Sequence, residues 1–455
     1  MSSIDRRRFL RGACCLGAVP LLGTRPLLGQ LSSVHDAALA ATPPGGPYKA
    51  LVCVYLAGGH DSFNLLVPRT GADYATYAAT RSDLAVPQAD ILPVTPATPT
   101  GRDFGLHPAA AALQARFAAG RLAFVANVGT LVQPITRAQY QAGTVQKPRH
   151  LFSHSDQTEL WESQSAQAAN DLGWAGRVGD FVLPLNGGSP LSPAITIAGS
   201  TRMLRGQTVA PYAMRTSGTV SLSGTSGTSG ARRLASLQAI DALPHGHAME
   251  RGFADLREQA IALDSQIRTA LDAAVPMATV FPTTSLGRQL EMVARMIGIR
   301  GALGVLRQVF FVRLGGFDTH DNQLTFLPTL LTALGEAVSA FDDAMVELGV
   351  DGDVTLFTTS EFGRTLTFNG RGTDHGWGGV QFALGGAVAG GDIYGAMPDY
   401  ALGGPDDAGN GRVIPTLAVE QYAATLASWF GVAPGDLPTV FPRLSVFGAG
   451  NLGFV

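Results

Sequence analysis

The chain has 455 residues, of which 46% are hydrophobic and 15% charged, and its formal net charge at pH 7 is -3. A chain of this length and composition can bury a large core, which excludes a wholly disordered protein, and its balance of charge gives no basis for binding nucleic acid. Of the three cysteines only Cys53 lies beyond residue 40, so an intramolecular disulfide is excluded once the first 40 residues are removed.

The first 40 residues are typical of an export signal. Three arginines at residues 6–8 precede Phe9, Leu10 and an apolar run over residues 12–23, and paired arginines followed by Phe-Leu resemble a bacterial twin-arginine leader. The alternative is an N-terminal membrane anchor, but the run is shorter than the roughly 20 residues of a bilayer span. We therefore expect a signal peptide over residues 1–40, the twin-arginine export machinery as a partner, a periplasmic or extracellular mature protein, and no stable membrane span after leader removal.

Four apolar runs predict buried strands. None of them alternates polar with apolar residues, and each ends abruptly in glycine and polar residues, which is typical of parallel strands covered on both faces. The runs lie in the segments 50–64, 121–130, 308–323 and 353–365.

Helical patterns lie between these strands. In the longest of them, apolar residues repeat at spacings of three and four and the pattern ends at Gly349, which predicts an amphipathic helix. The predicted helices cover residues 108–117, 286–299, 327–348 and 419–430. Strands that alternate with helices predict an α/β fold with a mostly parallel central sheet sandwiched by helices.

One stretch departs from this alternation. Residues 217–230 are rich in serine and glycine, which predicts a flexible loop. Residues 231–274 have a helical pattern with a break at Pro244. We interpret residues 41–455 as a single α/β domain with a helical insertion over about residues 200–280.

Acidic and histidine side chains gather where the predicted strands end. Asp61 follows the first strand, Asp318 and His320 follow the third, Glu361 follows the fourth, and His375 lies a few residues beyond. In an open α/β sheet, ligands bind beyond the carboxyl ends of the strands, so we expect these five side chains to lie close together. Carboxylates and imidazoles bind divalent ions, which predicts a metal site for Zn, Mn or Ca. The alternative is that Asp318 caps the next helix and His320 bonds a loop carbonyl.

Other polar residues at the same predicted edge are candidates for catalysis and substrate binding. The chain lacks the G-x-S-x-G elbow of α/β-hydrolases and the phosphate-binding loop of NTPases. The candidate nucleophiles are Ser62, Thr130, Ser153 and Ser155. The candidates for lining the site or binding an anionic substrate are His60, Asn64, Arg149, His154, Arg364 and Asp374. Asp374 has the alternative of orienting His375, and His107 is expected to cap or pack against a helix.

Eight stretches, in order along the chain, resemble domain-of-unknown-function family 1501, whose members are exported and often carry twin-arginine leaders. They are LVCVYLAGGHDSFNLLVP, FGLHPAAAAL, GRLAFVANVGT, LFSHSDQTELWES, GWAGRVGD, GGFDTHDNQ, TSEFGRT and GTDHGWGG. That family is similar to the alkaline phosphatase and sulfatase superfamily. The resemblance implies an alkaline phosphatase-like fold and hydrolysis of phosphate or sulfate esters at one or two metal ions.

The resemblance also implies roles for single residues. Asp61 takes the place of an Asp metal ligand that follows the first strand, and Asp318, His320 and His375 resemble one metal site. Glu361 stands where sulfatases have the Asp of an S-D-H-G motif.

Two departures from the superfamily pattern leave two functions open. Phe362 replaces the histidine of S-D-H-G, and the Cys/Ser-x-Pro-x-Arg motif is missing, with Ser153 as its nearest counterpart and His154 as the second expected catalytic residue. We expect an exported metal-dependent hydrolase that acts on an anionic phosphate or sulfate ester. The alternative is a non-catalytic exported protein that keeps the fold and serves binding or assembly.

Overall fold

The computed structural model describes residues 46–164, 171–448 and 450–455. By its internal contacts, the chain from residue 44 onward forms one unit. The predicted signal peptide over residues 1–40 lies outside the described residues.

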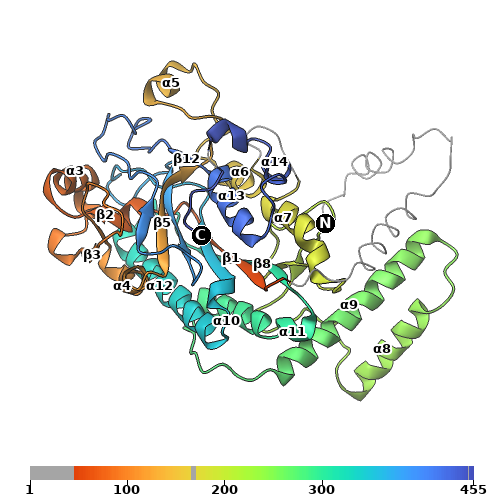
Figure 1. Cartoon of the computed structure of the whole chain (residues 1–455). Coiled ribbons are helices and arrows are strands. Elements are labelled where there is room, and N and C mark those ends of the chain that lie inside the picture. The colour runs from red at the N-terminus through yellow and green to blue at the C-terminus, as the bar shows by residue number, and fades with distance from the viewer. Residues whose placement is uncertain (1–45, 165–170, 449) are drawn as a thin grey trace, which may run out of the picture. The chain divides into compact units, whose positions relative to one another are not determined.

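A nine-stranded mixed sheet forms the centre of this unit (Figure 1). Neighbouring strands pair in parallel except at β10, which runs antiparallel to both β5 and β9. In spatial order the strands are β11 (Asp392–Tyr394), β5 (Leu122–Gly129), β10 (Gly379–Leu384), β9 (Val354–Thr359), β1 (Lys49–Ala57), β8 (Arg307–Gly315), β6 (Ala194–Thr196) and β7 (Tyr212–Ala213), and β12 (Leu417–Ala418) also pairs with β5. The predicted mostly parallel sheet is confirmed, and the four predicted runs form β1, β5, β8 and β9.

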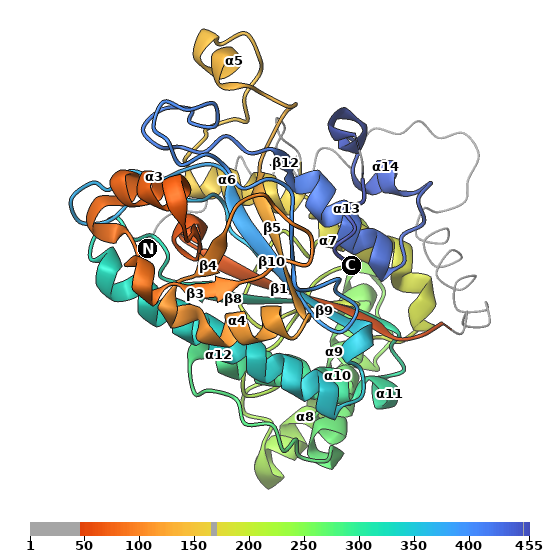
Figure 2. The same cartoon turned by 60° about the vertical axis from the view of Figure 1, so that its left-hand side comes forward.

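Helices cover both faces of the sheet (Figures 1 and 2). Successive side chains of a strand point to opposite faces, so Val52 and Val54 of β1 enter one hydrophobic core while Leu51 and Cys53 enter another. The first core includes residues of α4 (Ala111–Ala118), α10 (Ser285–Gly298) and α12 (Gln323–Glu347), and the second includes residues of α7 (Trp174–Val182), α13 (Val419–Phe430) and α14 (Leu437–Val440). The predicted arrangement of helices on both sides of the sheet is confirmed.

Helix α12 is long and apolar enough to cross a bilayer by length and composition alone. A core helix satisfies the same criterion, and Leu327, Leu331 and Leu334 of α12 are buried in the first core. The helix begins four residues before the predicted range and ends ahead of Gly349, whose φ of +63° suits glycine after a helix end.

The remaining elements complete the unit. They are a small sheet of β2 (Leu66–Pro68), β4 (Phe104–Leu106) and β3 (Leu92–Val94), and the helices α3 (Gly71–Arg81), α5 (Arg137–Ala142), α6 (His154–Ser163), α8 (Gly227–Asp241), α9 (Ala248–Ala273) and α11 (Arg300–Leu303). Helices α8 and α9 pair and project from the sheet and its covering helices (Figure 1). Pro244 separates them, as predicted, and α8 begins inside the stretch that was predicted to be a flexible loop.

Candidate metal centre

The carboxyl ends of three neighbouring strands meet at one edge of the sheet. β1 pairs in parallel with both β8 and β9, and Ala57 lies opposite Gly315. The loops that follow β8 and β9 carry Asp318 and Glu361. The loop after β1 approaches them closely at Gly58, where φ is +121° and an added Cβ would lie 2.2 Å from the amide nitrogen of Asp318. Only glycine fits this position without strain.

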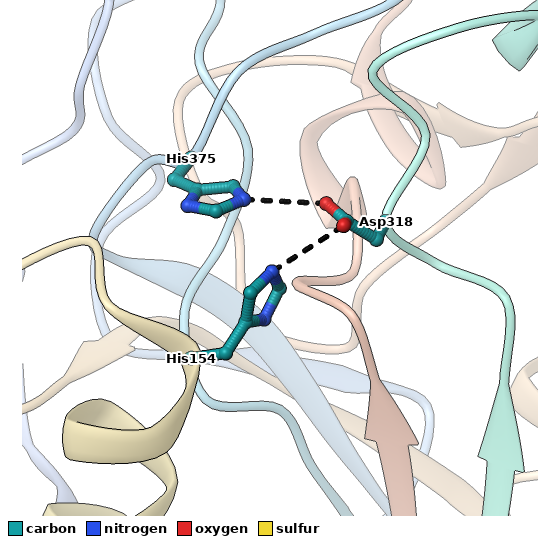
Figure 3. A group of neighbouring side chains, drawn as sticks. All are labelled: His154, Asp318 and His375. Carbon is teal, nitrogen blue, oxygen red and sulfur yellow. Dashed lines mark hydrogen bonds and ion pairs between the residues drawn. The ribbon is translucent and has the colours of Figure 1, made fainter.

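Three side chains from separate segments bring possible metal ligands together: His154 from the start of α6, Asp318 after β8, and His375 before β10 (Figure 3). One ligand atom from each lies within 4.8 Å of the other two. The Nε2 of His154 is 3.4 Å from Oδ2 of Asp318, and the Nε2 of His375 is 3.2 Å from Oδ1 of Asp318. The carboxylate therefore stands between the two imidazoles.

Two hydrogen bonds fix which nitrogen of these imidazoles carries the proton. The Nδ1 of His375 is 2.7 Å from the carbonyl oxygen of Phe152, which only accepts, so Nδ1 is the donor. The Nδ1 of His154 donates in the same way to Oε1 of Glu361 over 2.8 Å. Each Nε2 of a neutral ring is therefore left with its lone pair toward Asp318, as in a metal-ligating histidine.

His320 adds a third imidazole to the group. Its Nε2 lies 2.8 Å from Nε2 of His375 and 3.1 Å from Oδ1 of Asp318. Its Nδ1 donates to Oδ1 of Asp374 over 3.1 Å, so its Nε2 also carries a lone pair when the ring is neutral. We call His154, Asp318, His320 and His375 the ligand group below.

The ligand group fits a transition-metal ion by two observations. The Nε2 of His154 is buried without a hydrogen-bond partner, and the Nε2 lone pairs of His320 and His375 face each other, which is unfavourable unless a cation or a proton lies between them. The distances of 3.1 to 3.4 Å from Asp318 to each imidazole Nε2, and of 2.8 Å between the Nε2 atoms of His320 and His375, are similar to the roughly 3.3 Å between ligands of a tetrahedral ion with bonds of about 2.0 Å. The residues present could therefore hold a metal.

Arg364 keeps the carboxylate of the ligand group charged. Its Nη1 donates to Oδ1 of Asp318 over 2.8 Å, and its other contacts are to Gly58 and Thr373. Burial on its own would raise the pKa of Asp318, but the hydrogen bond and charge of Arg364, together with the imidazoles, outweigh it and lower that pKa below its ordinary value.

The pKa values of His154 and His375 are shifted in opposite directions. The hydrogen bond to Glu361 raises the pKa of His154 above its ordinary value, with burial opposing it. Burial lowers the pKa of His375, with the Phe152 carbonyl opposing it. His375 therefore favours the neutral form that binds a metal, while His154 holds a proton more readily when no cation is bound.

Phe362 forms an apolar wall of the centre. Its ring centroid lies 4.9 Å from that of His154 and 4.6 Å from that of His375. The ring packs on these imidazoles and leaves their Nε2 atoms facing Asp318, so the ligand group is intact beside it.

The structure does not bring Asp61 into the ligand group, in contrast to the prediction. Asp61 is buried, and its Oδ2 accepts hydrogen bonds from Arg81 of α3 and from Gln323 of α12. A buried carboxylate beside a guanidinium already has its counter-charge. Arg81 therefore takes the role that the prediction gave to a metal ion.

Glu361 and Asp374 lie behind the imidazoles rather than among the ligand atoms. The Oε1 of Glu361 accepts from the backbone N–H of Gly58 and from His154, both over 2.8 Å. Asp374 was predicted to contact substrate or to orient His375, but it accepts from His320 instead. Both acids act by holding an imidazole in place.

Three predicted substrate-binding residues are buried by other contacts. Arg364 is 0% exposed, and its guanidinium donates hydrogen bonds to Gly58, Asp318 and Thr373. Asn64 donates to the carbonyl of Leu84 and accepts from the hydroxyl of Tyr77. His60 is 2% exposed, neither ring nitrogen has a partner, and burial lowers its pKa to about 3. None of these side chains is free to meet a substrate.

The predicted nucleophile is placed beside α6 and not at the ligand group. Ser153 is the N-cap residue of α6, and its Oγ donates to Oδ2 of Asp156 over 2.7 Å. Arg149 pairs with Glu159 over 2.5 Å. His154 is the member of this segment that reaches the centre, as a candidate ligand.

Two contributors to the site carry no signal in the sequence. Phe152 supplies a backbone carbonyl, and its φ of +75° is unusual for a residue with a side chain. Arg81 is the last residue of α3, whereas Asp61 lies in the loop after β1. The prediction for His107 is confirmed, because its Nδ1 accepts from the backbone N–H of Ala109 at a helix start.

An open cleft of about 1280 Å³ lies beside the ligand group. His154 and Asp318 are part of its lining, as are Tyr55 and Thr158, whose hydroxyls lie 2.7 Å apart. Helix α6 contributes five residues to the lining, and three of them, His154, Thr158 and Glu162, lie one turn apart, so one face of this helix follows the cleft. The cleft gives a substrate access to the ligand group.

The comparisons with known proteins give one family and several distant structures. The family described as "Protein of unknown function (DUF1501)" matches residues 48–412. A comparison with curated proteins found no match.

Solved structures similar to this chain include a sulfatase from Pseudoalteromonas sp., at 9% identity and TM-score 0.34, covering 90% of this chain and 73% of that one. The lipoteichoic acid synthase from Listeria monocytogenes is similar at 8% identity and TM-score 0.33, covering 89% and 79%. The soluble domain of lipooligosaccharide phosphoethanolamine transferase A from Neisseria meningitidis is similar at 9% identity and TM-score 0.31, covering 86% and 91%. These similarities are distant and carry no argument about activity.

Proposed function

Since the chain belongs to the DUF1501 family of proteins of unknown function, its activity has to be inferred from its site, and we propose that it is an exported, metal-dependent hydrolase of phosphate or sulfate esters. The observation that carries this proposal is the convergence of imidazole Nε2 atoms on Asp318 beside an open cleft. The proposed metal ligands are His154, Asp318, His320 and His375.

The donor set favours zinc or manganese over calcium. Three imidazole nitrogens and one carboxylate are typical of sites for Zn²⁺ and similar ions, whereas Ca²⁺ sites are built from oxygen ligands. Of the metals suggested by the sequence, calcium is therefore the least suited to this group.

The chain's own residues prepare the site in three ways. Glu361 and the Phe152 carbonyl fix the rings of His154 and His375, and Arg364 keeps Asp318 ionised. A bound metal would polarise the ester and lower the pKa of a water molecule. Ser153 is absent from the cleft lining, so we propose water as the nucleophile.

Metal content tests this proposal most directly. Protein that lacks residues 1–40 is expected to bind stoichiometric Zn²⁺ or Mn²⁺, measured by elemental analysis and by titration of the metal-free protein. The double variant His154→Ala, His375→Ala is expected to lose affinity by more than about 100-fold, because two ligands are removed. A matched control is His150→Ala, whose ring is 72% exposed and pairs with Asp156 outside the ligand group.

Two results would contradict the proposal. The first is metal-free protein that takes up neither ion on titration, and the second is a double variant that binds as tightly as the control. Turnover of aryl phosphates and aryl sulfates then separates the two classes of ester. Stoichiometric metal without turnover of either would favour the alternative, a binding or assembly protein that keeps the fold.

A further inference from the structure

Two arginines with no acidic partner line the same cleft as the ligand group. Arg313 and Arg205 are both exposed, and among the described residues no carboxylate lies within ion-pair distance of either. The third arginine of the cleft, Arg202, differs because its Nη1 pairs with Glu159 over 2.9 Å. Arg313 and Arg205 are thus the cationic side chains of the cleft that remain available to a ligand.

Arg313 interrupts a strand that is otherwise buried up to its last residues. β8 is buried from Arg307 to Val312, and Arg313 is its first exposed residue. Side chains alternate along a strand, so Arg313 continues the row of Val309 and Phe311, and Phe311 also lines the cleft. The strand therefore delivers a positive charge to the cleft five residues before Asp318.

Arg205 is presented by a fixed backbone. Its carbonyl accepts from the N–H of Gly173 over 2.8 Å, and an added Cβ on Gly176 of α7 would lie 2.1 Å from the carbonyl carbon of Arg205. This close packing holds the main chain at one place on the cleft wall. The guanidinium of Arg205 is exposed and has no carboxylate partner among the described residues.

The acids of the cleft are for the most part already engaged. Glu159 pairs with Arg149 and Arg202. Glu162 accepts from the hydroxyl of Thr201 over 2.7 Å and from the backbone N–H of Arg202. Asp171 is exposed and is the carboxylate of the cleft with no such contact among the described residues. Two free guanidinium groups therefore outnumber the one free carboxylate away from the ligand group.

A second hollow adjoins the cleft at Arg313. This hollow has a volume of about 430 Å³ and shares Ala198 and Arg313 with the cleft. Its lining also includes Ser285 and Gln289, which are polar and uncharged. The two adjoining hollows together have more volume than a single small anion requires.

We infer that Arg205 and Arg313 form an anion subsite, and that the substrate is an elongated ester with a second anionic group which binds there while its scissile ester lies at the ligand group. This inference rests on the proposed function for the reacting end of the substrate. Guanidinium groups bind phosphate and sulfate through paired N–H donors, which makes either anion suitable for the subsite. Such a substrate is selected by two charges at a distance from each other.

The test compares two ligands that differ in one charged group. Protein that lacks residues 1–40 is loaded with Zn²⁺, and the affinities of hexane-1,6-diol bisphosphate and hexyl phosphate are measured by calorimetry. The bisphosphate is expected to bind about tenfold or more tightly. Arg205→Gln with Arg313→Gln is expected to remove this advantage and leave the affinity for hexyl phosphate unchanged. Arg215→Gln, an exposed arginine outside the cleft, controls for a general loss of charge.

Two outcomes overturn the subsite: equal affinities for the two ligands in the unaltered protein, or an advantage of the bisphosphate that persists in the double variant. Metal titration of the same samples reports on the proposed function separately. If the protein takes up no metal, the proposed function fails, and the dependence of bisphosphate binding on Arg205 and Arg313 still decides the subsite.

Discussion

Asp374 shows how a residue that was predicted to meet substrate can serve the site through a neighbour. Its carboxylate accepts from Nδ1 of His320, and Asn369 donates to the same oxygen over 3.2 Å. The side chain of Asp374 is 54% exposed, so little of the fold depends on it. Its contribution is the orientation and tautomer of one imidazole.

Replacement of Asp374 by alanine is therefore expected to weaken Zn²⁺ binding by about 10- to 100-fold. The free energy of unfolding of the metal-free protein should change by less than about 1 kcal/mol. Competition titration with a zinc chelator measures the first effect, and urea unfolding the second.

Asp321→Ala is the matched control for Asp374→Ala. Asp321 is also exposed and pairs with Arg371 rather than with an imidazole. Both changes remove one negative charge near the centre. Equal loss of zinc affinity in the two variants would show that charge alone, and not the orientation of His320, accounts for the effect.

Glu420 carries a pH dependence that is separate from the metal centre. It lies in the first turn of α13 at 1% exposure, its Oε2 has no hydrogen-bond partner, and Arg443 is 3.8 Å away. Burial raises its pKa to about 7 from an ordinary value of 4.5. Between these two values the folded state keeps a proton that the unfolded chain has lost, so stability falls as the pH rises through this window and stays lower above it.

Glu420→Gln is expected to remove this loss because glutamine does not ionise. The variant should be more stable than the unaltered protein at pH 8, by up to about 3 kcal/mol, and similar to it at pH 4. Thermal unfolding over pH 4 to 8 measures the difference. The assignment is wrong if the two proteins lose stability in parallel across that range.

At the scale of elements, the loop after β1 decides whether the strand ends can meet. Gly58 has φ of +121° and no room for a side chain beside Asp318. Gly218 has the same φ, but nothing lies within 4 Å of an added Cβ. Substitutions at these two glycines can therefore be compared: both would place a side chain in an unfavourable backbone conformation, but only the one at Gly58 would also cause a steric clash.

Gly58→Ala is expected to destabilise the protein by several kcal/mol more than Gly218→Ala, because only the first forces the β1 and β8 loops apart. It should also weaken metal binding, since Asp318 is displaced. Denaturant unfolding and zinc titration of both variants provide the comparison. Similar losses in the two variants would mean that the contact with Asp318 is easily relieved.

The presence of a strand could be predicted from the sequence, but its direction could not. β1, β5, β8 and β9 could be predicted because a buried strand is a short apolar run that ends in glycine and polar residues. The antiparallel direction of β10 could not, because a strand buried on both faces has the same composition in either direction. Direction depends on how the preceding loop returns, and the sequence does not specify that path.

The candidate site was predictable in part for similar reasons. Asp318, His320 and His375 follow from their places beyond strand ends. The pairing of Asp61 with Arg81 could not be predicted, because it depends on how α3 packs rather than on any local pattern. Whether an acid binds a metal or an imidazole depends on its position in three dimensions to within a few ångströms, which the sequence does not specify.

For the whole molecule, we propose that residues 1–40, outside the described structure, determine where the protein is located. We propose that the leader sends the folded chain through the twin-arginine pathway. Replacing Arg6 and Arg7 by lysine is expected to keep the protein inside the cell, because that pathway requires the paired arginines. Fractionation of cells that produce the two forms measures this. Lysine variants that leave the cell as efficiently would indicate another route. The control is Arg205→Gln, which changes an arginine outside the leader sequence.

The origin of the ligand group in distant parts of the chain has a consequence for the order of folding. His154 and Glu361 are 207 positions apart, and His375 and Asp318 are 57 apart. Contacts of long sequence separation form late, because the chain must first close large loops. Partly folded chains in which β1, β8 and β9 have not yet paired would lack the high-affinity site. Metal uptake during refolding should then follow the slowest global phase, so a bound ion would mark a chain that has finished folding, and under the proposed export it would do so before transport.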